Sequence, residues 1–241
     1  YWRIMATDSK LSINFQDLML YRIHEILLVA SPYDAFILEE DGRLTQQILY
    51  EYLGMNLSYA PRVWRADNAS QGLKMLSDRS YDLVIVMMRI ADMDPITFGE
   101  KVKADFPDKP VILLAFDESE ITALPQTRLR KTIDKVFIWS GNANVFPAII
   151  KNIEDRENWR RDYEIADIRA IIIVEDDPRY YSIILPLIYR TALKHARNLI
   201  NKSLSDTDKL LVFRARPKVI LVSTYEQAVE LYDKYRHNIL G

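Results

Sequence analysis

The chain contains three consecutive acids, Glu175, Asp176 and Asp177, whose carboxylates could together bind a cation. They directly follow the apolar run Ile171–Val174 and precede Pro178 and a long helical pattern. Carboxylates gathered at the end of a buried strand repel one another unless a cation lies among them. Mg²⁺, which prefers oxygen ligands, is the usual cation in such a place. The triplet therefore predicts a Mg²⁺ site, and the alternative is that the same acids form a turn and cap a helix.

Composition excludes several other kinds of site. The chain has no cysteine, so disulfides, thiolate zinc sites and cysteine nucleophiles are excluded. Its six glycines form neither a phosphate loop nor a dinucleotide-binding fingerprint, which argues against common nucleotide enzymes. A formal charge of −2 gives no electrostatic reason to expect nucleic acid or an anionic membrane as a partner. No apolar run approaches the roughly 20 residues of a membrane helix, and we expect a cytoplasmic protein.

Predicted strands and predicted helices alternate regularly along the chain. The predicted strands are Ile26–Val29, Arg62–Arg65, Leu83–Met88, Val111–Phe116 and Lys135–Trp139. The predicted helices are Ala35–Leu53, Ala69–Leu76, Thr97–Asp105, Glu118–Leu124 and a last one from Val145 onward. Strands that alternate with helices predict an α/β fold, with a doubly wound parallel sheet of five strands that is flavodoxin-like in size.

We expect four segments along the chain. Residues 1–22 are predicted as an N-terminal helical extension, because Leu11–Ile23 places apolar residues at roughly helical spacing. Residues 23–153 form the first α/β domain. Residues 154–167 are interpreted as a helical linker, because the last helix becomes highly charged over Glu154–Arg161. Residues 168–241 begin a second α/β unit.

The second unit repeats the start of the first. Pro61-Arg62-Val63 and Pro217-Lys218-Val219 both open an apolar strand, and Ile26–Val29 corresponds to Ile171–Val174. The second copy ends at Gly241, inside its predicted third strand, so we expect a fragment of a longer protein. A half-sheet leaves an apolar edge, and a homodimer or strand exchange is our hypothesis for covering it.

With this repeat and the strand–acid pair–helix unit, the whole chain resembles two receiver domains of bacterial response regulators in tandem. That family holds Mg²⁺ with an acid pair after strand one and phosphorylates an aspartate at the end of strand three. A Thr or Ser ends strand four, and a Lys follows strand five. The resemblance implies that Glu175 and Asp176 hold Mg²⁺ in the second domain only, that Asp177 is peripheral, and that the acceptor aspartate lies beyond Gly241.

The first copy departs from the family pattern at every one of these positions. The residues found there are Ala30 and Ser31 for the acid pair, Met87 for the acceptor, Ala115 for the hydroxyl, and Trp139 or Ser140 for the lysine. A methionine can neither form an acyl phosphate nor bind a hard cation well. We therefore predict a pseudo-receiver, which keeps the fold without the phosphorylation.

These features together predict a non-catalytic signalling module whose partners are proteins, such as a kinase or a downstream effector domain. The chain is also similar to the N-terminal region of bacterial proteins that fuse receiver-like domains to a PEP/pyruvate-binding module. The residues that carry this similarity are Ile37–Leu44 and Arg214–Pro217. The competing class is an enzyme or small-ligand binder with a flavodoxin-like fold and a site at the carboxyl edge of the sheet. The lack of a glycine-rich phosphate loop speaks against it.

Overall fold

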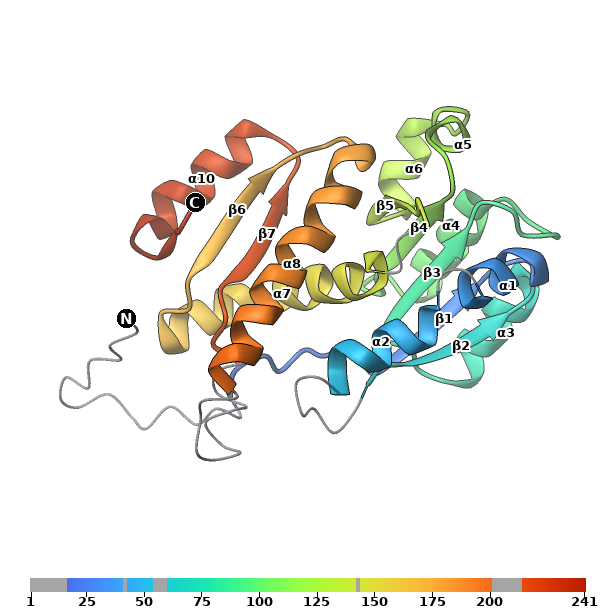
Figure 1. Cartoon of the computed structure of the whole chain (residues 1–241). Coiled ribbons are helices and arrows are strands. Elements are labelled where there is room, and N and C mark those ends of the chain that lie inside the picture. The colour runs from blue at the N-terminus through green and yellow to red at the C-terminus, as the bar shows by residue number, and fades with distance from the viewer. Residues whose placement is uncertain (1–16, 41–42, 54–59, 142–143, 201–213) are drawn as a thin grey trace.

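The described residues form two β-sheets, and the strands within each sheet are parallel (Figure 1). The computed structural model describes residues 17–40, 43–53, 60–141, 144–200 and 214–241. The strands of the first sheet are β1 (Glu25–Val29), β2 (Arg62–Ala66), β3 (Leu83–Met87), β4 (Val111–Ala115) and β5 (Lys135–Ile138). The second sheet contains β6 (Ala170–Val174) and β7 (Lys218–Val222).

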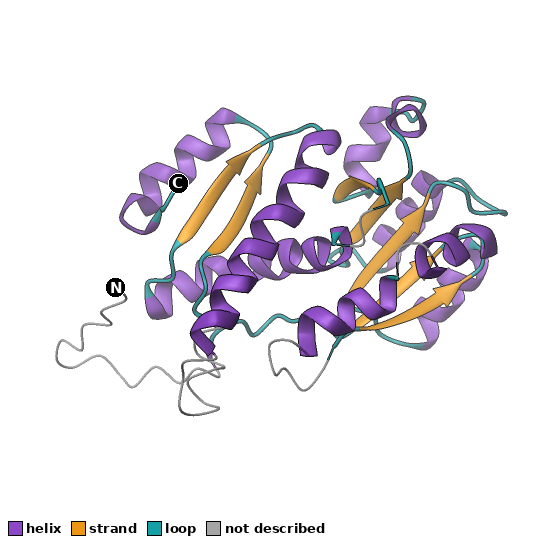
Figure 2. Ribbon diagram, in the orientation of Figure 1, coloured by secondary structure: helices purple, strands orange, loops and turns teal. Residues whose placement is uncertain are grey.

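The first sheet has the order β2-β1-β3-β4-β5 with parallel neighbours, which is the flavodoxin-like order. The predicted α/β fold class and all five predicted strands are therefore confirmed. Every residue of β3 and β4 is buried, because near-continuous apolar runs suit strands that are covered on both faces. Figure 2 shows helices on both sides of these strands.

The helices differ from the prediction in two places. They are α1 (Pro32–Glu40), α2 (Leu44–Leu53), α3 (Ala69–Asp78), α4 (Pro95–Asp105), α5 (Glu118–Thr122), α6 (Gln126–Thr132), α7 (Val145–Ala166), α8 (Pro178–Ile200) and α10 (Tyr225–Tyr235). The single helix predicted for Ala35–Leu53 is wrong, because Arg43 has a left-handed backbone (φ 46°) that separates α1 from α2. The sequence also gave no sign of α6. None of the described helices combines the length and apolar composition that a membrane span requires.

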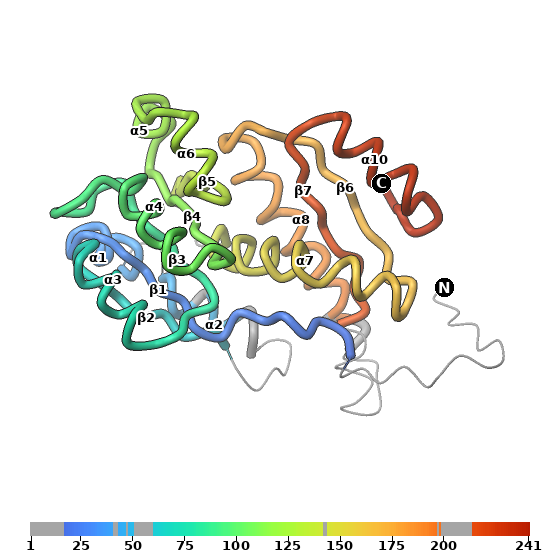
Figure 3. The backbone as a smooth tube through the Cα atoms, turned by 180° about the vertical axis from the view of Figure 1, so that it is seen from behind, coloured from blue at the N-terminus to red at the C-terminus, as the bar shows by residue number. Residues whose placement is uncertain are grey.

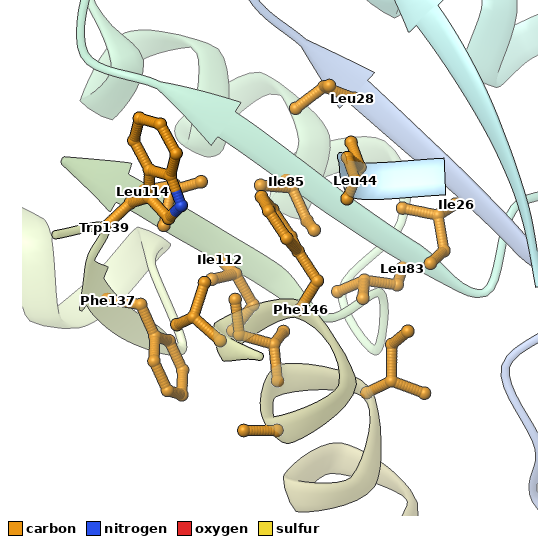
Figure 4. Packing of buried hydrophobic residues seen from close by; sticks show 14 of the residues in the cluster. Ile26, Leu28, Leu44, Leu83, Ile85, Ile112, Leu114, Phe137, Trp139 and Phe146 are labelled. Carbon is orange, nitrogen blue, oxygen red and sulfur yellow. The ribbon is translucent and has the colours of Figure 1, made fainter. Parts of the chain in front are cut away.

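One apolar core joins the two sheets. On the first sheet it contains side chains of β1, β3 and β4 together with Phe146 and other residues of α7 (Figure 4). The same cluster continues to Tyr181, Leu185 and Tyr189 of α8 and to Val219 of β7. A second cluster fills the opposite face of the first sheet, under α3, α4 and α6.

The second sheet begins in the same way as the first. β6 and β7 are parallel partners, and a parallel bridge joins Ala170 to Ile239. The Leu240 amide donates to the Ala170 carbonyl (2.8 Å), and the Ile172 amide donates to the Gly241 carbonyl (2.8 Å). Residues 239–241 therefore lie along β6 on the side away from β7, as β3 lies along β1 on the side away from β2.

One expectation about the segments outside the two α/β units needs correction. Residues 154–166 are helical as expected and form the C-terminal half of α7, a helix that packs against β7 and α8. Residues 18–24, expected to be mostly helical, have no helix and run beside α7 instead (Figure 3). The rest of the predicted N-terminal helical extension lies outside the described residues. The domain boundaries themselves stay a prediction.

Candidate functional site

The carboxyl ends of β1, β3 and β4 bring apolar residues to the positions where the resemblance expects acids and a hydroxyl group. Ala30, Met87 and Ala115 are 1%, 0% and 0% exposed. Trp139 is also buried, and its ring meets Phe116 edge-on at 5.4 Å between ring centres. Figure 4 shows Trp139 beside Leu114 over this end of the sheet. Side chains that are closed off from water and lack oxygen atoms cannot bind a hard cation or take a phosphoryl group.

Ser31 and Ser140 are the two polar residues at the receiver positions of the first copy. The Ser31 hydroxyl accepts a hydrogen bond from the Asp34 amide (3.1 Å), and its carbonyl accepts one from the Ala35 amide (2.9 Å). Ser31 therefore caps the start of α1. Ser140 is exposed beyond the end of β5.

Sequence reasoning missed a buried carboxyl group near this edge. Asp34 is 1% exposed in the first turn of α1, and within the described residues neither of its oxygens has a hydrogen-bond partner. The spacing Ser31-x-x-Asp34 has the form of a capping box, but Asp34 does not complete one, because neither of its oxygens accepts the Ser31 amide. Asp34 is the one buried acid of α1, and a single carboxyl group does not make a binding site.

Other acids near the first sheet act as helix caps. Asp94 accepts from the amides of Ile96 and Thr97 at the start of α4. Asp117 caps α5, and the hydrogen bond from Ser119 holds the pKa of its carboxyl below the usual value. Asp92 lies in the loop between β3 and α4, but it accepts from two amides at the start of α3, 2.8 and 2.9 Å away. Because each is used by a helix end, the three do not form a common site.

The acid triplet of the second sheet is divided between two roles. The Asp177 carboxylate accepts from the Arg179 amide (2.8 Å), and its carbonyl accepts from two amides of the first turn, so Asp177 caps α8. The Arg179 guanidinium also binds the Asp177 carboxylate and lowers its pKa. The same guanidinium reaches Glu118 of α5 (3.1 Å). The cation required near Asp177 is therefore an arginine, and the turn-and-cap alternative holds for this residue.

Glu175 and Asp176 remain as candidate metal ligands. Glu175 accepts the Asp177 amide (3.0 Å) through one carboxylate oxygen, and Asp176 is exposed. Their oxygens are the donor type that Mg²⁺ prefers, and Mg²⁺ usually keeps several waters. The donor chemistry of these two residues thus fits the ion. Among the described residues, no group of three or more His, Cys, Asp or Glu side chains is arranged to hold a metal.

Helix α8 also covers the free edge of the first sheet. The Tyr181 hydroxyl donates to the Val136 carbonyl, and the Ile138 amide donates to the Ser182 hydroxyl (3.0 Å). Lys135 lies 5.3 Å from the centre of the Tyr181 ring, and burial lowers the pKa of its amine. Since β5 is an edge strand, these backbone groups would otherwise lack partners.

A buried ion cluster, which we call the α7 cluster, was not anticipated. Its three ion pairs are Lys151–Glu154 (2.6 Å), Arg216–Asp155 (2.7 Å) and Lys218–Asp162 (2.9 Å). All six side chains are at most 2% exposed. Burial lowers the pKa of both lysines. For Arg216 burial acts in the same direction, but the Asp155 carboxylate outweighs it and raises the pKa.

Polar side chains on one face of α7 also accept hydrogen bonds from the segment before β1. The amides of Met19, Tyr21 and Ile23 donate to Asp162, Asn158 and Glu154, respectively, at 3.1, 2.9 and 3.2 Å. Alternate residues of an extended chain are spaced much like every fourth residue of a helix. One row of α7 side chains can therefore accept hydrogen bonds along the whole segment. The α7 cluster therefore ties three parts of the chain together: residues 18–24, α7 and β7.

Two hollows in the described part of the chain lie away from the carboxyl edge of the first sheet. One cavity of about 10 Å³ lies in the apolar core, lined by Ile26, Phe146 and their neighbours. A more open hollow of about 240 Å³ is lined by residues 76–81, Phe106 and Lys109. These residues precede β3 and β4, so this hollow lies at the end of the sheet opposite the carboxyl edge.

Comparisons with known proteins give only structural likenesses. No family model and no curated protein matches the chain. A receiver domain protein from Clostridium thermocellum has 17% identity and a TM-score of 0.41, with 56% of this chain and 97% of that chain covered. The receiver domain of an HD domain-containing protein from Pseudomonas fluorescens Pf-5 has 24% identity and a TM-score of 0.41, with 58% and 94% covered.

A third solved structure is the response regulator TrrA from Thermotoga maritima in complex with Mg²⁺-BeF, with 19% identity and a TM-score of 0.35. The alignment covers 49% of this chain and 88% of that one. The flavodoxin-like fold of the first sheet follows from its own strand order without these likenesses.

Proposed function

We propose that this chain is a regulatory module of signal transduction whose first domain is a pseudo-receiver that acts through protein contacts. The proposal rests on the buried residues Ala30, Met87 and Ala115 at the three strand ends where phosphotransfer would take place. A phosphorylated site needs a carboxylate nucleophile and oxygen ligands for a cation. Ala30, Met87 and Ala115 offer neither, while the strand order that would display them is intact.

The second part of the proposal concerns Glu175 and Asp176, which would hold Mg²⁺ at the end of β6. When bound, the ion would neutralise charge that develops on a transferring phosphoryl group. Asp177 and Arg179 keep the start of α8 in place beside these two acids. The partners we propose are a kinase or a downstream effector domain, of which a PEP/pyruvate-binding module is the narrower candidate. The competing small-ligand function is not favoured, because the chain has no glycine-rich phosphate loop.

The first test is phosphorylation. The 241-residue chain, incubated with radiolabelled acetyl phosphate and Mg²⁺, is expected to acquire no stoichiometric aspartyl phosphate. A receiver domain with an intact acid pair and acceptor, treated in parallel, serves as the positive control. A hydroxylamine-labile phosphate on this chain in one-to-one amount would contradict the proposal, and peptide mapping would identify the modified residue.

The second test is Mg²⁺ binding, measured by isothermal titration calorimetry. We expect wild-type protein to bind Mg²⁺ and the double variant Glu175→Gln/Asp176→Asn to lose binding, because its amides carry no charge to offset the cost of dehydrating the ion. Asp177→Asn is the matched control, since asparagine caps a helix as well as aspartate does and should leave binding intact. Absence of binding to wild-type protein, or equal binding by the double variant, would rule out this metal site.

A further inference from the structure

Lys135, the first residue of β5, extends from the first sheet to the end of the second. Its ammonium lies 3.5 Å from the hydroxyl oxygen of Ser223, the residue that directly follows β7. The Glu175 amide donates to the Val222 carbonyl (2.9 Å), so the ends of β6 and β7 lie together. An amine carried by the first sheet therefore lies at the edge of the second sheet where Glu175 and Asp176 follow β6.

Helix α8 contacts this lysine and limits its movement. Figures 1 and 3 show α8 between β5 and the second sheet. The Tyr181 hydroxyl donates to the Val136 carbonyl of β5, and the Lys135 ammonium lies 5.3 Å from the centre of the Tyr181 ring. This is the distance of a cation–π contact. The lysine is thus a half-buried charge in a fixed place and differs from a solvated surface lysine.

Asp176 is the acid that acts on the Lys135 ammonium. None of the ion pairs in the described part of the chain includes Lys135. Burial and the Arg156 guanidinium lower the pKa of its amine, whereas the Asp176 carboxylate raises it. Arg156 is itself paired with Glu157 (2.9 Å). The Asp176 carboxylate is therefore the negative charge that stabilises this ammonium, although the two groups are not in ion-pair contact.

The arginine at this edge is already paired with other acids. The Arg179 guanidinium binds the carboxylates of Asp177 and Glu118. Neither of these acids is a proposed metal ligand. Among the described residues, Lys135 is then the cation left to balance the two proposed ligands.

We propose that Lys135 is the internal counter-charge of the Glu175/Asp176 site and opposes the binding of Mg²⁺ there. This inference rests on the proposed Mg²⁺ site and adds a residue of the first sheet that controls its affinity. An ammonium and a divalent cation repel each other, so Mg²⁺ binds only against this repulsion. Metal occupancy at the end of β6 is thereby coupled to the position of β5.

Isothermal titration calorimetry with MgCl₂ at low ionic strength tests this role. Lys135→Met removes the charge and keeps a long side chain, and it is expected to bind Mg²⁺ about threefold or more tightly than wild-type protein. Lys135→Arg keeps the charge and should bind like wild type. Lys101→Met, the same replacement at an exposed lysine of α4, is the matched control and should also bind like wild type. The gain from Lys135→Met should shrink in concentrated KCl, because salt screens the repulsion.

The sign of the change separates this role from a structural one. If Lys135 only supported the packing of β5 on α8, its loss would leave Mg²⁺ binding unchanged or weaken it. Either result overturns the proposal, as does a gain in affinity that does not depend on salt.

A double-mutant cycle without metal tests the charge pair separately. In the presence of EDTA, the effects of Lys135→Met and Asp176→Asn on urea unfolding should be non-additive by at least about twofold in the equilibrium constant, because each removes the same attraction. Additive effects overturn the counter-charge. A non-additive cycle in a protein that binds no Mg²⁺ with either Lys135 or Met at this position would overturn the metal site and leave the charge pair standing.

Discussion

Replacement of Asp155 by alanine is expected to lower the free energy of unfolding by about 3–5 kcal/mol. The reason lies in the α7 cluster, where Asp155 is 0% exposed and accepts two hydrogen bonds from Arg216, at 2.7 and 2.9 Å. It also accepts from the Val219 amide (2.9 Å) and the Tyr189 hydroxyl (3.1 Å). Alanine leaves a buried guanidinium without its counter-charge, and the cost of desolvating that charge is no longer offset. Urea unfolding followed by circular dichroism measures the change.

Two controls separate the loss of a counter-charge from other causes. The double variant Asp155→Leu/Arg216→Met removes both charges and fills the space, and it should recover most of the stability lost in Asp155→Ala. Glu100→Ala breaks the exposed ion pair between Glu100 and Arg128 and should change stability little, because water screens exposed pairs. If Asp155→Ala costs no more than Glu100→Ala, the α7 cluster does not hold the two sheets together.

The framework of the first sheet could be predicted from the sequence because its signal is local. Leu83–Met87 and Val111–Ala115 are continuous apolar runs, and the structure covers both faces of these strands. The break between α1 and α2 was missed, since it depends on the left-handed backbone of Arg43, a residue type without a preference for that conformation. Helix α6 was missed because it is one short element in a polar stretch.

The candidate sites were harder to predict from local sequence patterns than the first sheet was. The strand end before Glu175 was visible in the sequence, but the pairing of Asp177 with Arg179 was not considered, although the two are neighbours along the chain. The charged residues Glu154–Arg161 were interpreted as part of a helical linker. The partner of Asp155 lies 61 residues away, and only the folded chain brings Arg216 to it. Local patterns predict which residues are charged, whereas burial of the charge depends on distant partners.

Restoring a single acid to the first sheet is expected to destabilise the protein without restoring phosphorylation. Met87→Asp should lower the free energy of unfolding by about 3 kcal/mol or more, because Met87 is 0% exposed between apolar strand ends. The shorter side chain leaves a cavity, and the carboxyl group loses its water without gaining a cation. Met87→Leu, which keeps the volume and the apolar character, should cost less than about 1.5 kcal/mol. Urea unfolding of both variants measures the difference.

A phosphorylation assay of Met87→Asp tests whether an acceptor carboxylate alone restores phosphorylation. An acceptor carboxylate alone is not sufficient, because charge on the phosphoryl group must be met by a bound cation and a lysine. Ala30 offers no metal ligand, and Ser140 offers no positive charge. We therefore expect no aspartyl phosphate after treatment with acetyl phosphate and Mg²⁺. A stable Met87→Asp variant that takes phosphate would mean that these strand ends remain open to water, and it would argue against a pseudo-receiver closed by its own core.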